Sequence, residues 1–87
     1  MMNQATGPSD AELRQRVRDG LGSGKLFQVD GNGFAGRGTQ QHCAVCHRPV
    51  LTSDMEIRIE EPRQAFAHSK CYAIWLEESK ALRESGN

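Results

Sequence analysis

Three cysteines and one histidine form two pairs whose spacing suits a metal ion. Cys43 and Cys46 have two residues between them, and so do His68 and Cys71. A two-residue spacing lets a tight turn aim both cysteine sulfurs at one point, at metal–sulfur distances of about 2.3 Å. His68 and Cys71 would project from the same side of a helix, because they lie one turn apart. Zinc prefers such donors, so we expect one zinc ion on Cys43, Cys46, His68 and Cys71.

The predicted zinc ion is structural rather than catalytic. Four protein ligands complete a tetrahedron and leave no position for water or substrate, so we do not expect an enzyme. A chain of 87 residues is marginally stable without a metal, disulfides or a partner. Three cysteines are an odd number, which counts against a disulfide framework. We therefore expect metal binding and folding to be coupled.

The segment Cys43–His47 also has the form C-x-x-C-H, the attachment motif of c-type haem. This alternative would make the chain a redox protein. It gives no role to His68 and Cys71, and haem is attached outside the cytosol, so zinc is the favoured interpretation. His42 and His47 could exchange into the metal site, but we expect them at the surface or beside the ligands.

Residues 1–24 are predicted to form an N-terminal helical arm. Ser9 and Glu12 have the spacing of a capping box, which marks the start of a helix. Glycines 20, 22 and 24 mark its end. A thin apolar stripe runs between these signals, made of Leu13, Val17 and Leu21.

Residues 25–41 are predicted to be a glycine-rich, flexible connector. Glycine loses much conformational entropy when it is ordered, so the many glycines of this segment favour flexibility. Four apolar side chains interrupt the connector and could dock as a short extended piece on the next domain: Leu26, Phe27, Val29 and Phe34.

Residues 42–87 are predicted to form the zinc-binding domain. Apolar and charged residues alternate over 55–60, which predicts a half-buried strand. A turn over 61–64 and a returning strand over 65–67 complete a hairpin. A helix follows from Ser69 and ends at 85–87. We expect Trp75 on this helix to pack against the apolar side of the first strand, formed by Met55, Ile57 and Ile59, and we expect Tyr72 to be exposed.

This order of two cysteines, a hairpin and a histidine–cysteine pair opening a helix resembles the treble-clef zinc finger. The spacing is also similar to that of the first half of a LIM domain, and to that of small uncharacterised bacterial zinc-binding proteins. The resemblance covers residues 41–82 and implies a small α+β fold with a zinc knuckle, a β-hairpin and a C-terminal helix. A full LIM domain needs eight ligands, so a single-metal half is implied. His47 stands where such knuckles often have glycine, a turn position that histidine tolerates better than most residues.

Charge and hydropathy restrict the partners. Lys plus Arg and Asp plus Glu both number 11, so the net charge is zero, which argues against a polybasic surface for membranes or nucleic acids. No apolar run is long enough to cross a membrane, and residues 1–7 do not form a signal peptide, so we expect a cytoplasmic location. The favoured function is a non-catalytic protein-interaction module. The alternative is nucleic-acid binding through Arg14, Arg16, Arg18, Arg37 and Arg48.

Overall fold

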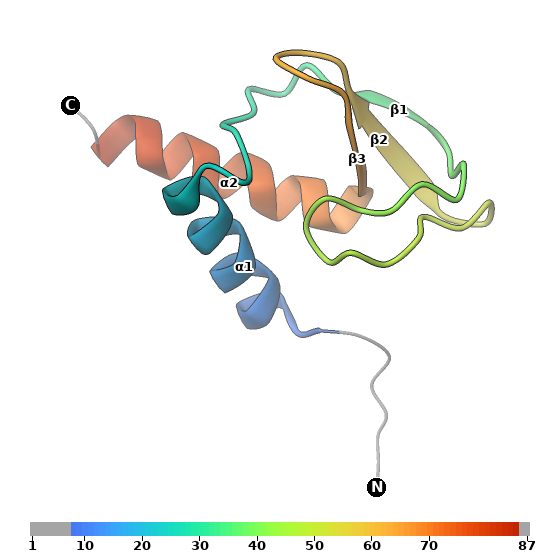
Figure 1. The fold of residues 1–87 in the computed structure, drawn as a ribbon, viewed down its shortest axis with the longest axis horizontal. Helices are drawn as coiled ribbons and strands as arrows, with labels where there is room; N and C mark the ends of the chain where they lie inside the picture. The colour runs from blue at the N-terminus through green and yellow to red at the C-terminus, as the bar shows by residue number, and fades with distance from the viewer. Residues whose placement is uncertain (1–7, 86–87) are drawn as a thin grey trace, which may run out of the picture.

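The computed structural model describes residues 8–85 and shows a small α+β fold (Figure 1). Its three strands form one antiparallel sheet in the order β1-β2-β3. The expected α+β class is confirmed, but the sheet has three strands where the sequence predicts a two-stranded hairpin. The elements are α1 (Asp10–Ser23), β1 (Phe34–Arg37), β2 (Met55–Ile59), β3 (Ala65–His68) and α2 (Ser69–Ser85).

Two of the expectations concern the ends of the chain. The predicted lack of a signal peptide in residues 1–7, and the predicted end of the last helix at residues 86 and 87, lie outside the described residues. Between residues 8 and 85, neither helix combines the length and the apolar character that a membrane span requires.

Helix α1 begins where the sequence predicts. Ser9 is the N-cap: its hydroxyl accepts a hydrogen bond from the Glu12 backbone N–H (3.2 Å), and the Glu12 carboxylate accepts one from the Ser9 N–H (3.1 Å). The helix ends at Gly24, which adopts the left-handed conformation with φ 84°. The predicted apolar stripe is buried at Leu13 and Val17, which belong to the core.

The segment 25–41 differs from the flexible connector that the sequence predicts. The Trp75 indole N–H donates to the carbonyl of Phe27 (2.8 Å), and the Val29 N–H donates to the Ser79 hydroxyl (3.0 Å). The expected docking of an extended piece is thus confirmed at these two positions. The chain then forms β1, which pairs with β2 along its whole length. Backbone hydrogen bonds to distant partners therefore offset the entropy cost of ordering the glycines.

The faces of β2 differ from the predicted pattern. Ile59 is buried as expected, but Met55 is 55% exposed and Glu56 is only 5% exposed. The cause is Thr39, which lies over this side of the strand and donates from its backbone N–H (3.0 Å) and its hydroxyl (2.6 Å) to the Glu56 carboxylate. A buried carboxylate that accepts two hydrogen bonds is tolerated, whereas an unpaired one would be costly.

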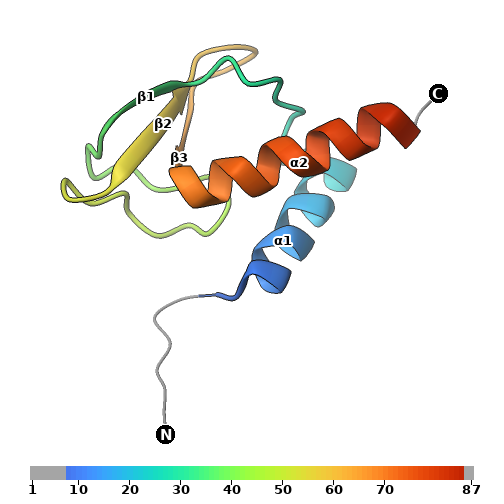
Figure 2. The ribbon, with the colours of Figure 1, turned by 180° about the vertical axis from the view of Figure 1, so that it is seen from behind.

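The core is centred on Trp75, which is fully buried in α2. Its ring contacts those of Phe27 (centroids 5.3 Å apart) and Tyr72 (6.3 Å, edge to face). Tyr72 is half-buried rather than exposed as predicted. Helix α2 packs against β2 and β3 as well as α1, and Figure 2 shows α1 crossing it. One helix therefore connects the sheet and the N-terminal helix.

Glu78 joins α1 to α2. Its buried carboxylate accepts hydrogen bonds from Arg14 Nη1 (2.7 Å) and Arg18 Nε (2.8 Å). Hydrogen bonds from Arg18 and then Arg14 hold the pKa of Glu78 below its usual value. A surface ion pair between Lys70 and Asp10 (2.8 Å) supports the same contact. Arg14 and Arg18, predicted as possible phosphate contacts, therefore serve the packing of the two helices.

Replacing Glu78 by glutamine should destabilise the protein modestly. The amide keeps the shape of the side chain but removes the charge that the two arginines share. We expect a loss of about 1 kcal/mol in the free energy of unfolding at low salt, because solvent screens both guanidinium groups. Urea unfolding with saturating zinc measures this loss, which high salt should reduce. Glu84→Gln, an exposed site on the same helix, is the matched control, and equal losses in both variants would contradict the assignment.

Candidate metal centre

Cys43 and Cys46 lie in a tight turn, here called the knuckle (residues 42–49). The Cys43 N–H donates to the carbonyl of Arg48 (2.9 Å), and the His47 N–H donates to the carbonyl of Cys43 (2.9 Å). His47 has a left-handed backbone with φ 67°, as the turn requires, so the expectation that histidine can replace glycine here is confirmed. This turn brings both thiols to one side of the backbone.

The second pair of candidate ligands lies where the sheet meets α2. His68 is the last residue of β3, and Cys71 lies in the first turn of the helix. The knuckle is held beside them, because the Ala44 N–H donates to the carbonyl of Phe66 on β3 (2.8 Å). This hydrogen bond, together with core packing of the three cysteines, holds the two pairs next to each other.

The four candidate ligand atoms all lie within 4.8 Å of one another. His68 Nδ1 is 3.4 Å from Cys46 Sγ and 4.0 Å from Cys71 Sγ. Two donors of a tetrahedral zinc ion, with bonds of about 2.0 Å to nitrogen and 2.3 Å to sulfur, lie about 3.6 Å apart. All three cysteines are buried and none forms a disulfide. Cys43, Cys46, His68 and Cys71 could thus hold one metal ion, and their donor set fits zinc.

The three thiols influence one another's ionisation. A hydrogen bond from the Cys71 thiol, with further ones from backbone N–H groups, lowers the pKa of Cys43 to about 4. The Cys43 thiolate in turn raises the pKa of Cys71, and burial raises the pKa of Cys46. Ionisation of Cys43 therefore opposes ionisation of Cys71 when no cation is present. A bound metal ion would favour the thiolates and displace protons from them.

A carboxylate lies behind the histidine. Because Nδ1 of His68 faces the sulfurs, its other nitrogen is directed outward, and His68 Nε2 lies 3.8 Å from Asp54 Oδ2. The same carboxylate accepts a hydrogen bond from the Leu51 N–H (3.1 Å), which helps to fix its position. A carboxylate that is hydrogen-bonded to a metal-bound histidine selects its tautomer and raises its basicity. At 3.8 Å Asp54 makes no such hydrogen bond, so it acts on His68 through its negative charge alone.

Replacing Asp54 by asparagine should weaken metal binding without unfolding the chain. Loss of a carboxylate that is hydrogen-bonded to a ligand histidine commonly costs 10–100-fold in affinity; without that hydrogen bond, we expect Asp54→Asn to cost less than about tenfold. The asparagine oxygen can still accept from Leu51, so the loop should persist. Competition with a fluorescent zinc chelator measures the affinity. Asp19→Asn is the control, because Asp19 bonds only Gln15 on the surface of α1; an unchanged affinity for Asp54→Asn would contradict the assigned role.

The other predicted site residues lie outside this cluster. Arg16 Nη1 donates to the carbonyl of Cys46 (3.2 Å), so this arginine supports the knuckle from α1. Arg37 lies in β1, and Arg48 lies in the knuckle. His42 and His47 are exposed and do not belong to the cluster. With Arg14 and Arg18 bound to Glu78, at least three of the five candidate nucleic-acid contacts bond protein groups.

Sequence reasoning missed Asp54 and the role of Arg16. Asp54 precedes β2 and meets His68 only because β2 and β3 are paired, with Glu56 opposite His68. Arg16 meets the knuckle only because α1 folds back on the rest of the chain. No spacing rule contains either contact, because both depend on tertiary structure.

Comparisons of the chain with protein-family models, curated proteins and solved structures found no match. The geometry of the cluster itself indicates a metal centre, because four donors converge on one point and the three thiols among them are buried.

Proposed function

We propose that this chain is a structural zinc module, resembling a treble clef, that serves as a non-catalytic protein-interaction domain. The observation that carries the proposal is the convergence of three buried cysteines and one histidine within 4.8 Å. The knuckle, the β2–β3 hairpin and the start of α2 surround this point in the order typical of a treble clef. Four protein ligands would complete the coordination of one ion and exclude substrate.

A bound zinc ion would supply positive charge to the thiolates and link two distant parts of the chain. The chain prepares this link itself: Ala44 bonds Phe66, and Arg16 bonds the Cys46 carbonyl. Cys43, Cys46 and Cys71 also belong to the hydrophobic core. Removing the ion would therefore leave either buried thiolates that repel one another or protonated thiols that no longer hold the two parts of the chain together.

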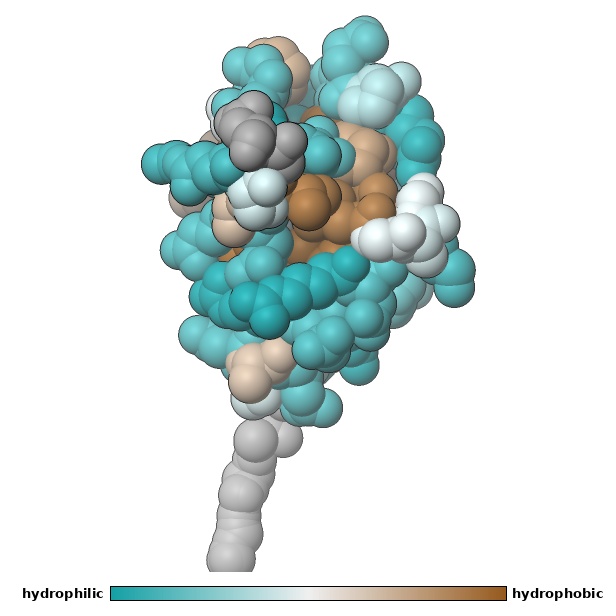
Figure 3. Space-filling view, turned by 90° about the vertical axis from the view of Figure 1, so that its left-hand side faces the viewer, coloured by the Kyte–Doolittle hydropathy of each residue, from teal (hydrophilic) through white to brown (hydrophobic). Residues whose placement is uncertain are grey.

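The surface supports a protein partner better than a nucleic acid. Four large apolar side chains are exposed in the described part of the chain: Phe34, Leu51, Met55 and Leu82. Figure 3 also shows hydrophobic residues open to view on one face of the molecule, and exposed apolar side chains are useful at protein interfaces. Arg14 and Arg18, in contrast, are bound to Glu78. We expect no binding of a random DNA duplex at low salt, and a steep salt-dependent affinity would favour the nucleic-acid alternative instead.

A haem protein is the less supported alternative. Haem attachment requires both knuckle sulfurs to reach one porphyrin edge, whereas Cys43 and Cys46 are buried beside His68 and Cys71. Clustered free thiols are stable in a reducing compartment, which supports the proposed cytoplasmic location.

Hydrogen exchange before and after chelation tests whether the metal is structural. We expect amides of β3, the knuckle and the first half of α2 to lose protection when zinc is removed and to regain it when zinc is restored. This follows because the four ligands connect these elements. Unchanged protection after complete metal removal would show that the fold does not need the ion, and would overturn the proposal of a structural role.

A further inference from the structure

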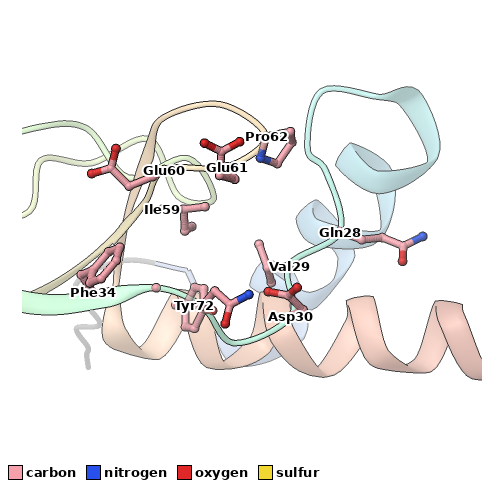
Figure 4. A pocket seen from close by; sticks show the side chains of 11 residues that line it. Gln28, Val29, Asp30, Phe34, Ile59, Glu60, Glu61, Pro62 and Tyr72 are labelled. Carbon is pink, nitrogen blue, oxygen red and sulfur yellow. The ribbon is translucent and has the colours of Figure 1, made fainter.

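A cavity of about 490 Å³ opens between the segment 28–34 and the turn that joins β2 to β3 (Figure 4). It shares no lining residue with the metal centre. Its apolar walls are Val29 and Ile59, which are buried, and Phe34, which is 58% exposed. Figure 4 shows Phe34 and Tyr72 on one side of the space and Pro62 across it. A preformed hollow with an exposed aromatic ring is suited to a side chain from another molecule.

The lining of this cavity is acidic. Three carboxylates line it, those of Asp30, Glu60 and Glu61, and no lysine, arginine or histidine does. Glu60 pairs with Arg58 (2.9 Å), while Asp30 and Glu61 enter no ion pair with any described residue. We name this feature the acid-rimmed cavity. Its charge is complementary to a cation with an apolar stem.

We infer that the acid-rimmed cavity binds an arginine side chain presented by a partner protein. The inference rests on the proposed protein-interaction function and names the chemistry of the partner. An arginine has a long aliphatic stem for the walls formed by Val29 and Ile59. Its guanidinium carries five N–H donors, which suit the carboxylates of Asp30 and Glu61.

Two further features of the walls favour a guanidinium. The Arg58 guanidinium already lies over the Phe34 ring (5.8 Å from its centroid) while it bonds Glu60, so this ring accepts such a group within the chain itself. The Tyr72 hydroxyl oxygen is buried in the same wall and has no hydrogen-bond partner among the described residues.

The test uses the zinc-loaded full chain and a short blocked peptide with one arginine between glycines. We expect the peptide to shift the amide NMR signals of the segment 28–34 and of the β2–β3 turn, saturably and with an affinity that salt weakens. The same peptide with citrulline, an uncharged analogue of arginine, should bind much more weakly. Shifts that are absent, that lie elsewhere, or that are equal for the two peptides would overturn the inference.

Variants locate the site. Asp30→Asn combined with Glu61→Gln should lower the affinity for the peptide by about fivefold or more, as expected from the loss of two partly exposed ion pairs. Asp19→Asn combined with Glu84→Gln removes the same charge away from the cavity and should leave the affinity unchanged; equal losses in both would overturn the inference. Zinc content and folding are verified in every sample, so a failed titration concerns the cavity alone. A folded sample without metal would instead refute the proposed zinc module.

Discussion

Replacing Cys71 by serine should prevent stable folding at neutral pH, even with excess zinc. Cys71 is a candidate ligand and also lies in the core beside the other ligands. Structural zinc sites contribute about 10–16 kcal/mol, whereas a whole small domain is stable by about 5–15 kcal/mol. The variant loses one of four ligands and places a hydroxyl in the core. We expect the resulting loss of free energy to exceed the net stability of an 87-residue chain. Far-ultraviolet circular dichroism and thermal unfolding measure the effect.

The matched control for Cys71→Ser is His42→Ala. His42 precedes the first ligand, is a common metal-binding residue type, and is exposed outside the cluster. We expect this variant to keep its fold and its metal. If Cys71→Ser retained full thermal stability and one bound metal ion, the assigned set of four ligands would be wrong.

Replacing Trp75 by alanine should cost about 3–5 kcal/mol in the free energy of unfolding. The side chain is fully buried, and its ring contacts both Phe27 and Tyr72. The variant would also leave the Phe27 carbonyl without its indole donor. Urea unfolding with saturating zinc separates this loss from an effect on the metal, because Trp75 is not a candidate ligand.

Two companion variants make the Trp75 result specific. Trp75→Phe keeps most of the apolar volume and removes the hydrogen bond, so it should cost less than alanine. Leu82→Ala truncates a side chain on the same helix that is 43% exposed, and it should cost under about 1 kcal/mol. A loss for Trp75→Ala no larger than that for Leu82→Ala would show that α2 does not pack as described.

Local sequence signals predicted the local structure well. Ser9 and Glu12 sit three residues apart, so the capping box could be read directly, and the helix starts there. The spacing within each cysteine or histidine pair likewise reflects a turn of only a few residues. Histidine tolerates a left-handed backbone better than most residues, and His47 indeed has φ 67°. Such features are predictable because all their atoms belong to neighbouring residues.

Features that depend on distant contacts were missed or misread. All four residues of β1 are exposed, so the strand has no apolar alternation to reveal it, and it exists through its pairing with β2. Glu56 occupies a polar position of an alternating pattern and is therefore expected at the surface. It is buried because Thr39 donates two hydrogen bonds to its carboxylate. Arg14 and Arg18 resemble a solvated helix face until α2 supplies Glu78. The sequence contains these residues but not their proximity.

Native mass spectrometry of the chain purified without chelator shows whether a folded molecule holds a metal ion. The structure brings three thiols and one imidazole together, so we expect one zinc ion on each folded molecule. Adding chelator under the same conditions should yield a metal-free species with the broad charge distribution of an unfolded chain. A folded molecule that carries no metal, or one that carries a covalently attached haem, would contradict the proposed structural zinc site.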